Sequence, residues 1–202
     1  MAEAQNYRAP QSLGHWGTVS LGIGAIALIA WGIGTYFNVE QGLRSWILGF
    51  IFWGGIGIGS LGLLMLQYLT GGAWGIVIRR PLEAGTRTLP LLMLLFIPIA
   101  IGVATHSVYE WTHLPATDPV MAQRGIFMTP WAWILRGFVF LGIFFIMAYL
   151  LNKWSDNQDA STTFDDSAMW LEKMSKFSGP TLVIYCLVVT FATVDWVLSL
   201  DP

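Results

Sequence analysis

One stretch of the chain restricts its fold more than any other, the uncharged run from Ser45 to Ile78. These 34 residues contain no Asp, Glu, Lys, Arg or His, and two arginines follow them directly. About 20 apolar residues are enough for a helix to cross the hydrocarbon core of a bilayer. The run therefore predicts a membrane-spanning helix over residues 45–69. We expect Thr70-Gly71-Gly72 to end this helix and residues 73–78 to form an interfacial segment.

The same run is rich in glycine, and three of its glycines share one helical face. Gly55, Gly59 and Gly62 follow one another at i, i+4 and i+7. In water, glycine weakens a helix by roughly 1 kcal/mol relative to Ala. In lipid, small residues allow a neighbouring helix to approach closely. The spacing predicts a helix-packing face, and its simplest interpretation is packing that carries no chemistry.

The composition as a whole is that of a membrane protein. Hydrophobic residues make up 55% of the chain and charged residues 11%, whereas charged residues make up about 25% of soluble proteins. We predict an all-α integral membrane protein, a single bundle of about five transmembrane helices that occupies residues 1–202. Hydropathy places its spans near residues 16–37, 45–69, 88–109, 127–151 and 179–200.

Basic residues are distributed unevenly between the two sides of this predicted bundle. One side carries seven of them, Arg8, Arg79, Arg80, Arg87, Lys153, Lys173 and Lys176. The other side carries only Arg44 and Arg124. Because basic loops stay in the cytoplasm, we expect a cytoplasmic N-terminus and an outward-facing segment from His106 to Arg124. Within the inner loop of residues 152–178, residues 157–166 (NQDASTTFDD) have the composition of turns and disorder, and residues 166–177 are expected to form a short surface helix.

Two charged residues fall inside predicted spans, Arg136 and Asp195. A charge in a span costs about 2.5–3.5 kcal/mol on insertion scales and usually faces a partner or a cavity. Both residues are expected in the outer half of the membrane, where they could pair. They could form a structural ion pair, take part in quinone binding or proton transfer, or extend toward the membrane surface. We expect them to line a polar pocket together with His106 and Glu110.

The outer end of the third span has a polar pattern of its own. His106, Glu110 and His113 are spaced i, i+4 and i+7, and so would share one face if the helix continued. A histidine beside a carboxylate suits proton release to the outer phase. The same spacing could hold a metal ion, although no supporting ligands are visible, and we predict no metal site. Ordinary interfacial polar residues are the simplest interpretation.

Several cofactors and partners can be argued against from the sequence. A net charge of −2 gives no reason to expect nucleic acid as a partner. The single Cys186 excludes disulfides within the chain, Cys-ligated iron–sulfur clusters and CxxCH haem attachment. A bis-histidine haem needs two histidines on different helices at the same depth. His15 is expected at the inner surface and His106 and His113 at the outer surface, so we expect no such haem.

Four stretches of the chain together point to one family. The longest is residues 45–90 (SWILGFIFWGGIGIGSLGLLMLQYLTGGAWGIVIRRPLEAGTRTLP), and the others are YEWTH, WILRGFVF and the closing TVDWVLSLDP. These stretches resemble the F subunit of alternative complex III, a quinol:cytochrome c/electron-acceptor oxidoreductase. The closing stretch resembles a D-W-x-x-S-L-[DE]-P motif of that family, and YEWTH and WILRGFVF are similar to its third and fourth helices. The resemblance covers most of the chain after residue 30.

The resemblance implies a polysulfide-reductase-like subunit of the bacterial cytoplasmic membrane. It would pack beside a sister subunit that binds quinol, such as menaquinol, near the periplasmic face, and haem and iron–sulfur subunits would take the electrons. Because the family continues with a second half, we expect this chain to be the N-terminal half of a longer subunit. Two functions remain open, support of quinol binding or proton conduction, and purely structural anchoring of partner helices. A transporter half is disfavoured because the centres of the first three spans lack ionisable residues.

Overall fold

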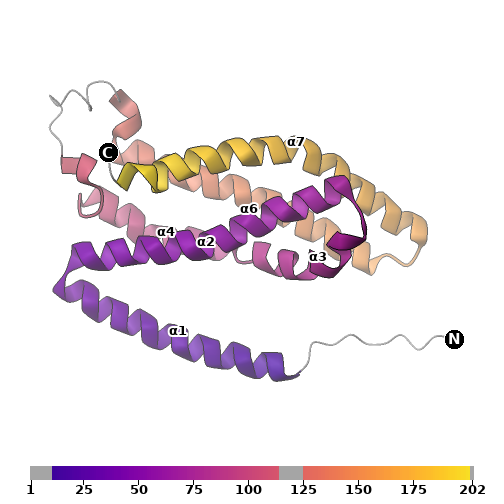
Figure 1. The fold of residues 1–202 in the computed structure, drawn as a ribbon, viewed down its shortest axis with the longest axis horizontal. Coiled ribbons are helices and arrows are strands. Elements are labelled where there is room, and N and C mark those ends of the chain that lie inside the picture. The colour runs from indigo at the N-terminus through magenta and orange to yellow at the C-terminus, as the bar shows by residue number, and fades with distance from the viewer. Residues whose placement is uncertain (1–10, 114–124, 201–202) are drawn as a thin grey trace. The chain divides into compact units, whose positions relative to one another are not determined.

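The computed structural model describes residues 11–113 and 125–200, and every regular element in these ranges is helical. Figure 1 shows their order along the chain. The chain divides into two compact units, residues 1–42 and residues 43–202. The long helices are α1 (Gln11–Phe37), α2 (Val39–Thr70), α3 (Ala73–Thr86), α4 (Leu89–Ala104), α6 (Pro130–Ala160) and α7 (Phe164–Trp196). The short 3₁₀ helices are η1 (Glu110–His113), η2 (Gly125–Met128) and η3 (Leu198–Leu200).

Five helical segments are long and apolar enough to cross a membrane, as the sequence predicts. They are Gly14–Phe37, Val39–Thr70, Val77–Ala104, Pro130–Ala160 and Phe164–Leu200. The third segment ends at Ala104, five residues before the predicted end at residue 109. The prediction of five membrane-length helices is therefore confirmed. Several boundaries differ, because the second, third and fifth segments begin before the predicted residues 45, 88 and 179, and the fourth extends past residue 151.

The described part of the first unit consists of α1, the turn at Asn38 and the first residues of α2, up to Gly42. Asn38 begins α2 because its Oδ1 accepts a hydrogen bond from the backbone N–H of Gln41 at 3.0 Å, the usual role of Asn at a helix start. The Trp31 indole donates to the carbonyl of Gly42 at 2.8 Å. The turn is thus closed by hydrogen bonds between the end of α1 and the start of α2.

The core of the second unit is built from α2, α4, α6, α7 and the segment before η1. Phe96 of α4 is completely buried and stacks on Trp133 of α6 with ring centroids 5.7 Å apart. Gly137 lies one turn further along α6, and a Cβ there would collide with the Phe96 ring. Trp196 of α7 approaches Phe50 of α2 edge-on, with centroids 5.5 Å apart. Aromatic side chains therefore hold four helices together at this level.

The break after α2 occurs where the sequence predicts it. Gly71 and Gly72 have φ values of 66° and 97°, which favour glycine because a side chain is strained in this region. The next helix, α3, is longer than the predicted interfacial segment, because it extends from Ala73 to Thr86. Arg79, Arg80 and Glu83 of α3 are bound to one another and to α6, and these contacts stabilise the additional turns.

The prediction of turns and disorder over residues 157–166 is wrong for all of these residues except 161–163. Helix α6 continues to Ala160, and only residues 161–163 separate it from α7. Thr163 caps α7, since its Oγ1 accepts a hydrogen bond from the Asp166 backbone N–H at 3.2 Å. The predicted surface helix over residues 166–177 is helical, but it is the first part of a continuous helix that ends at Trp196.

The predicted glycine face is only partly a contact within this chain. A Cβ on Gly62 would lie 2.8 Å from the Tyr185 ring of α7, so Gly62 permits close packing. Nothing lies within 4 Å of a Cβ built on Gly55 or Gly59, so the contact expected there is absent from the described parts of this chain. Gly54 and Gly57 instead face Leu92 and residues 88–89. The face of α2 that packs on α4 is therefore the one with Gly54 and Gly57, and not the predicted face with Gly55 and Gly59.

Candidate functional site

The predicted pairing of Arg136 and Asp195 is present in the structure. Arg136 Nε donates to Asp195 Oδ2 at 2.7 Å, and Nη2 donates to Oδ1 at 3.2 Å. The side chains are 25% and 17% exposed. Two parallel N–H···O bonds fix both the distance and the orientation of the two groups. The third guanidinium nitrogen, Nη1, donates to the carbonyl of Phe127 at 2.8 Å.

The backbone around Asp195 is held by side chains from three other elements. Trp133 donates from its indole to the Asp195 carbonyl at 2.8 Å, and Ser199 Oγ donates to the same oxygen. The Tyr109 hydroxyl donates to the Trp196 carbonyl at 3.1 Å. Burial raises the pKa of Tyr109, which lies beyond the end of α4, so this hydroxyl remains protonated and keeps donating. Residues 195–196 are consequently fixed where α7 ends.

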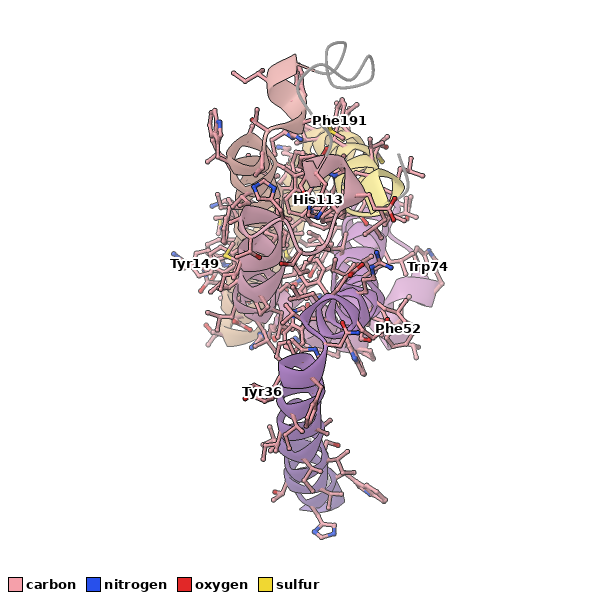
Figure 2. The ribbon with its side chains drawn as sticks, turned by 90° about the vertical axis from the view of Figure 1, so that its left-hand side faces the viewer. Tyr36, Phe52, Trp74, His113, Tyr149 and Phe191 are labelled. Atoms are coloured by element: carbon pink, nitrogen blue, oxygen red, sulfur yellow. The ribbon has the colours of Figure 1, made fainter. Side chains whose placement is uncertain are left out.

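A cavity of about 710 Å³ opens beside this ion pair. Three of its lining residues are phenylalanines, and the Arg136 guanidinium lies over the ring of one of them, Phe127, 5.8 Å from its centroid. Figure 2 shows Phe191, another wall residue, at the end of the second unit where His113 also lies. The cavity therefore combines a mostly apolar lining with one charged pair. The lining residues are Phe127, Met128, Arg136, Phe140, Phe191, Val194, Asp195, Leu198 and Ser199.

His106, Glu110 and His113 do not form the predicted helical face. Helix α4 ends at Ala104, and His106 has a φ of 59°, which turns the chain out of the helix. The rings of His106 and His113 nevertheless lie near each other, with centroids 6.2 Å apart. Glu110 pairs instead with Arg44 at 3.9 Å, and both side chains are largely exposed. Neither His106 nor Glu110 lines the cavity beside Arg136, so the shared pocket that we expected is not formed.

Metal binding finds no support in the side-chain arrangement. Among residues 11–113 and 125–200, no three His, Cys, Asp or Glu side chains are grouped closely enough to share a metal ion. Residues 114–124 lie outside the described residues, and with them Arg124 and part of the predicted outer segment. The described histidines of this region, His106 and His113, are in ring contact, without a third such side chain beside them.

A buried charge cluster that the sequence analysis did not single out ties α2, α3 and α6 together. Its centre is Glu83, whose side chain is 4% exposed. Arg79 Nε donates to Glu83 Oε1 and Arg80 Nη1 donates to Oε2, both at 2.8 Å. The Tyr68 hydroxyl and Ser155 Oγ donate to Oε1 as well, at 3.1 and 2.5 Å. Glu83 thus has charged or polar partners on all three helices.

Arg79, Arg80 and Arg87, which lie on α3 or just after it, extend the same cluster by binding side chains of α6. The pairs are Arg79 with Gln158 at 2.7 Å, Arg80 with Asp159 at 2.6 Å and Arg87 with Asp156 at 2.6 Å. The spacing of Arg79, Arg80 and Glu83 could have indicated the local part, because residues at i, i+3 and i+4 are neighbours on a helix. The partners on α6 are more than 60 residues away and carry no such signal.

Comparison with known proteins does not assign the chain to a family. No protein-family model matches the chain, and no curated protein is significantly similar to it. The site beside Arg136 and Asp195 therefore has to be interpreted from its own chemistry. Its features are a bidentate ion pair, an apolar and aromatic cavity, and a backbone held by three side-chain donors.

Proposed function

We propose that the chain is a multi-pass protein of the bacterial cytoplasmic membrane with its N-terminus in the cytoplasm. Five helices of membrane length support the insertion. The orientation follows from the basic residues, seven on one predicted side against two on the other. The bacterial membrane follows from the resemblance to the F subunit of alternative complex III.

The orientation predicts which positions react with a membrane-impermeant thiol reagent. In a Cys186→Ser background, a cysteine at position 110 (Glu110→Cys) should react when the reagent is added outside intact cells. A cysteine at position 162 (Thr162→Cys) should react only after the membrane is opened. Both native side chains are exposed, so access should depend on the side of the membrane alone. Labelling of position 162 but not 110 in intact cells would reverse the orientation.

The function we propose is that of a membrane subunit of a quinol:electron-acceptor oxidoreductase, which binds the quinol head group in the cavity beside Arg136 and Asp195. The observation that carries this proposal is a half-buried ion pair on the wall of a largely apolar cavity. A quinol has an apolar ring with two hydroxyl groups, and such a cavity offers apolar walls with few polar groups that fix orientation.

In this proposal the residues of the chain bind the quinol head group, orient it and receive a proton from it. A quinol hydroxyl would donate to the Asp195 carboxylate, which retains lone pairs beside its two bonds to Arg136. Oxidation to the quinone releases two protons and two electrons. The two electrons would pass to a haem or iron–sulfur centre of a partner subunit. Asp195 would receive one proton on its way to the outer phase, and the proton of the other hydroxyl would pass to water at the open side of the cavity.

Filling the cavity without touching the ion pair tests this proposal. Val194 lines the cavity and Val183 does not, although both lie on α7 and are exposed. In the assembled complex, Val194→Phe should lower quinol oxidation at least tenfold, and Val183→Phe should leave it near the parent value. Both variants should assemble equally well. Equal turnover in the two variants would show that quinol does not use the cavity.

A second function, structural anchoring, has its own supporting observation. Asp195 is bound on both its carboxylate and its carbonyl: Arg136 donates twice to the carboxylate, and Trp133 and Ser199 donate to the carbonyl. In this alternative the ion pair joins α6 to α7, and the open helical face of Gly55 and Gly59 packs against a partner subunit. Thermal stabilisation of the purified complex by menaquinol is expected for a quinol site and not for an anchor.

A further inference from the structure

A second cavity, which shares no lining residue with the one beside Arg136 and Asp195, lies between the start of α4 and the last turns of α6. Its volume is about 360 Å³. One part of its wall is polar or charged and is formed by Thr86, Arg87, Asn152, Lys153, Asp156 and Asn157. The other part is largely apolar and is formed by Pro90, Phe145, Ala148 and Tyr149. The cavity thus has a polar, charged part and an apolar part.

This change coincides with the ends of two apolar helical segments. Helix α4 is uncharged from its first residue, Leu89, and α6 is uncharged from Gly137 to Asn152. Arg87 comes just before the first segment and Lys153 just after the second. If these helices cross a membrane, as we propose, the charged part of the cavity lies at the depth of the lipid head groups and the apolar part at the depth of the acyl chains.

The charges of the cavity favour an anion. Arg87 donates from Nη2 to Asp156 Oδ1 at 2.6 Å and from Nε to Asn152 Oδ1 at 3.4 Å. Lys153 forms no ion pair within the described residues, and its Nζ lies 5.9 Å from the centroid of the Tyr149 ring. Two cations and one carboxylate leave one positive charge, which a phosphate diester would neutralise. Tyr149 is 53% exposed and lies at the outer edge of the unit, on the side away from Trp74 (Figure 2).

From this arrangement we propose that the cavity binds one anionic phospholipid. Lys153 and Arg87 hold the phosphate, and an acyl chain lies along Pro90, Phe145 and Ala148. The inference rests on the proposed membrane insertion but not on quinol binding. Basic pockets between membrane helices bind anionic head groups in this way, and a cation near the surface strengthens the attraction by about fivefold, equivalent to about 1 kcal/mol.

Native mass spectrometry of the full chain in detergent tests the proposal with defined lipids. The chain is mixed with equimolar phosphatidylglycerol, phosphatidylethanolamine and phosphatidylcholine. We expect one phosphatidylglycerol to be retained in preference to the other two. Lys153→Gln should reduce this preference about fivefold, because it removes the unpaired cation. Lys176→Gln is the matched control, since Lys176 is an exposed lysine of α7 outside the cavity, and it should leave the preference unchanged.

Three results would overturn the inference. Equal retention of the three lipids would exclude charge recognition, and equal effects of Lys153→Gln and Lys176→Gln would place the lipid elsewhere. Stabilisation by inorganic phosphate that matches that of phosphatidylglycerol and is lost in Lys153→Gln would identify a soluble anion in place of a lipid. Extraction of the chain from cell membranes by alkaline carbonate separates the two proposals. A chain that stays in the membrane without preferring phosphatidylglycerol refutes only the lipid site, whereas a chain that is released refutes the membrane proposal itself.

Discussion

Glu83→Gln is expected to lower the free energy of unfolding by about 3–5 kcal/mol, the range found when one partner of a buried ion pair is removed. The carboxylate is almost fully buried between Arg79 and Arg80. A neutral amide has nearly the same shape, but it removes the negative charge and offers only one accepting oxygen. The Arg79 side chain is 17% exposed, so its charge would remain buried and poorly compensated.

Two further variants separate the effect of charge from the effect of shape. Asp159→Asn removes an exposed partner of Arg80 and should cost about 0–1 kcal/mol, as surface ion pairs do. Adding Arg79→Met to Glu83→Gln should recover part of the loss, because the uncompensated charge is then absent. Unfolding in mixed SDS micelles, followed by the fluorescence of the eleven tryptophans, measures all of these variants. A loss for Glu83→Gln no larger than that for Asp159→Asn would mean that the cluster does not stabilise the fold.

The extent of the helices could be predicted where hydropathy and turn residues decide it. The uncharged run from Ser45 predicted α2, and the two glycines with positive φ end that helix at Thr70 as expected. The end of α6 could not be predicted in this way, because residues 152–160 are polar and rich in turn formers. Their helix is held by Arg79, Arg80 and Arg87, and contacts between residues so far apart in the chain leave no local pattern.

The candidate site could be predicted from the sequence only in part. A charge inside an apolar span needs a partner, and only Asp195 and Arg136 were such charges at similar expected depth, so their pairing could be anticipated. The spacing of His106, Glu110 and His113 suggested a shared face only as long as the helix continued. The left-handed backbone at His106 ends that continuity, and nothing in the residue type announces it. The packing role of Gly59 stays a prediction, because no side chain of the described residues lies within 4 Å of a Cβ at this position, whereas Gly62 on the same face contacts Tyr185.

Asp195→Asn is the second change for which a large effect is expected. The amide would leave the Arg136 guanidinium with the Phe127 carbonyl and a single neutral acceptor in place of a carboxylate. Because the pair faces a cavity and is partly exposed, we expect a loss of about 2–4 kcal/mol, near the lower end of the cost of breaking buried pairs. Reversible unfolding of the purified chain and the yield of the assembled complex report this loss.

The double variant Asp195→Asn with Arg136→Gln distinguishes the two proposed roles of the pair. Removing both charges should restore most of the stability and the assembly, since no unpaired charge remains, and the difference from the sum of the single variants gives the coupling between the two residues. A quinol site requires the carboxylate itself as proton acceptor, so quinol oxidation per assembled complex should stay low in the double variant even though its stability recovers. An anchor requires only a well-packed junction between α6 and α7, so turnover should recover together with assembly. Recovery of both would therefore assign the ion pair to structure, and recovery of stability alone would assign Asp195 to quinol oxidation.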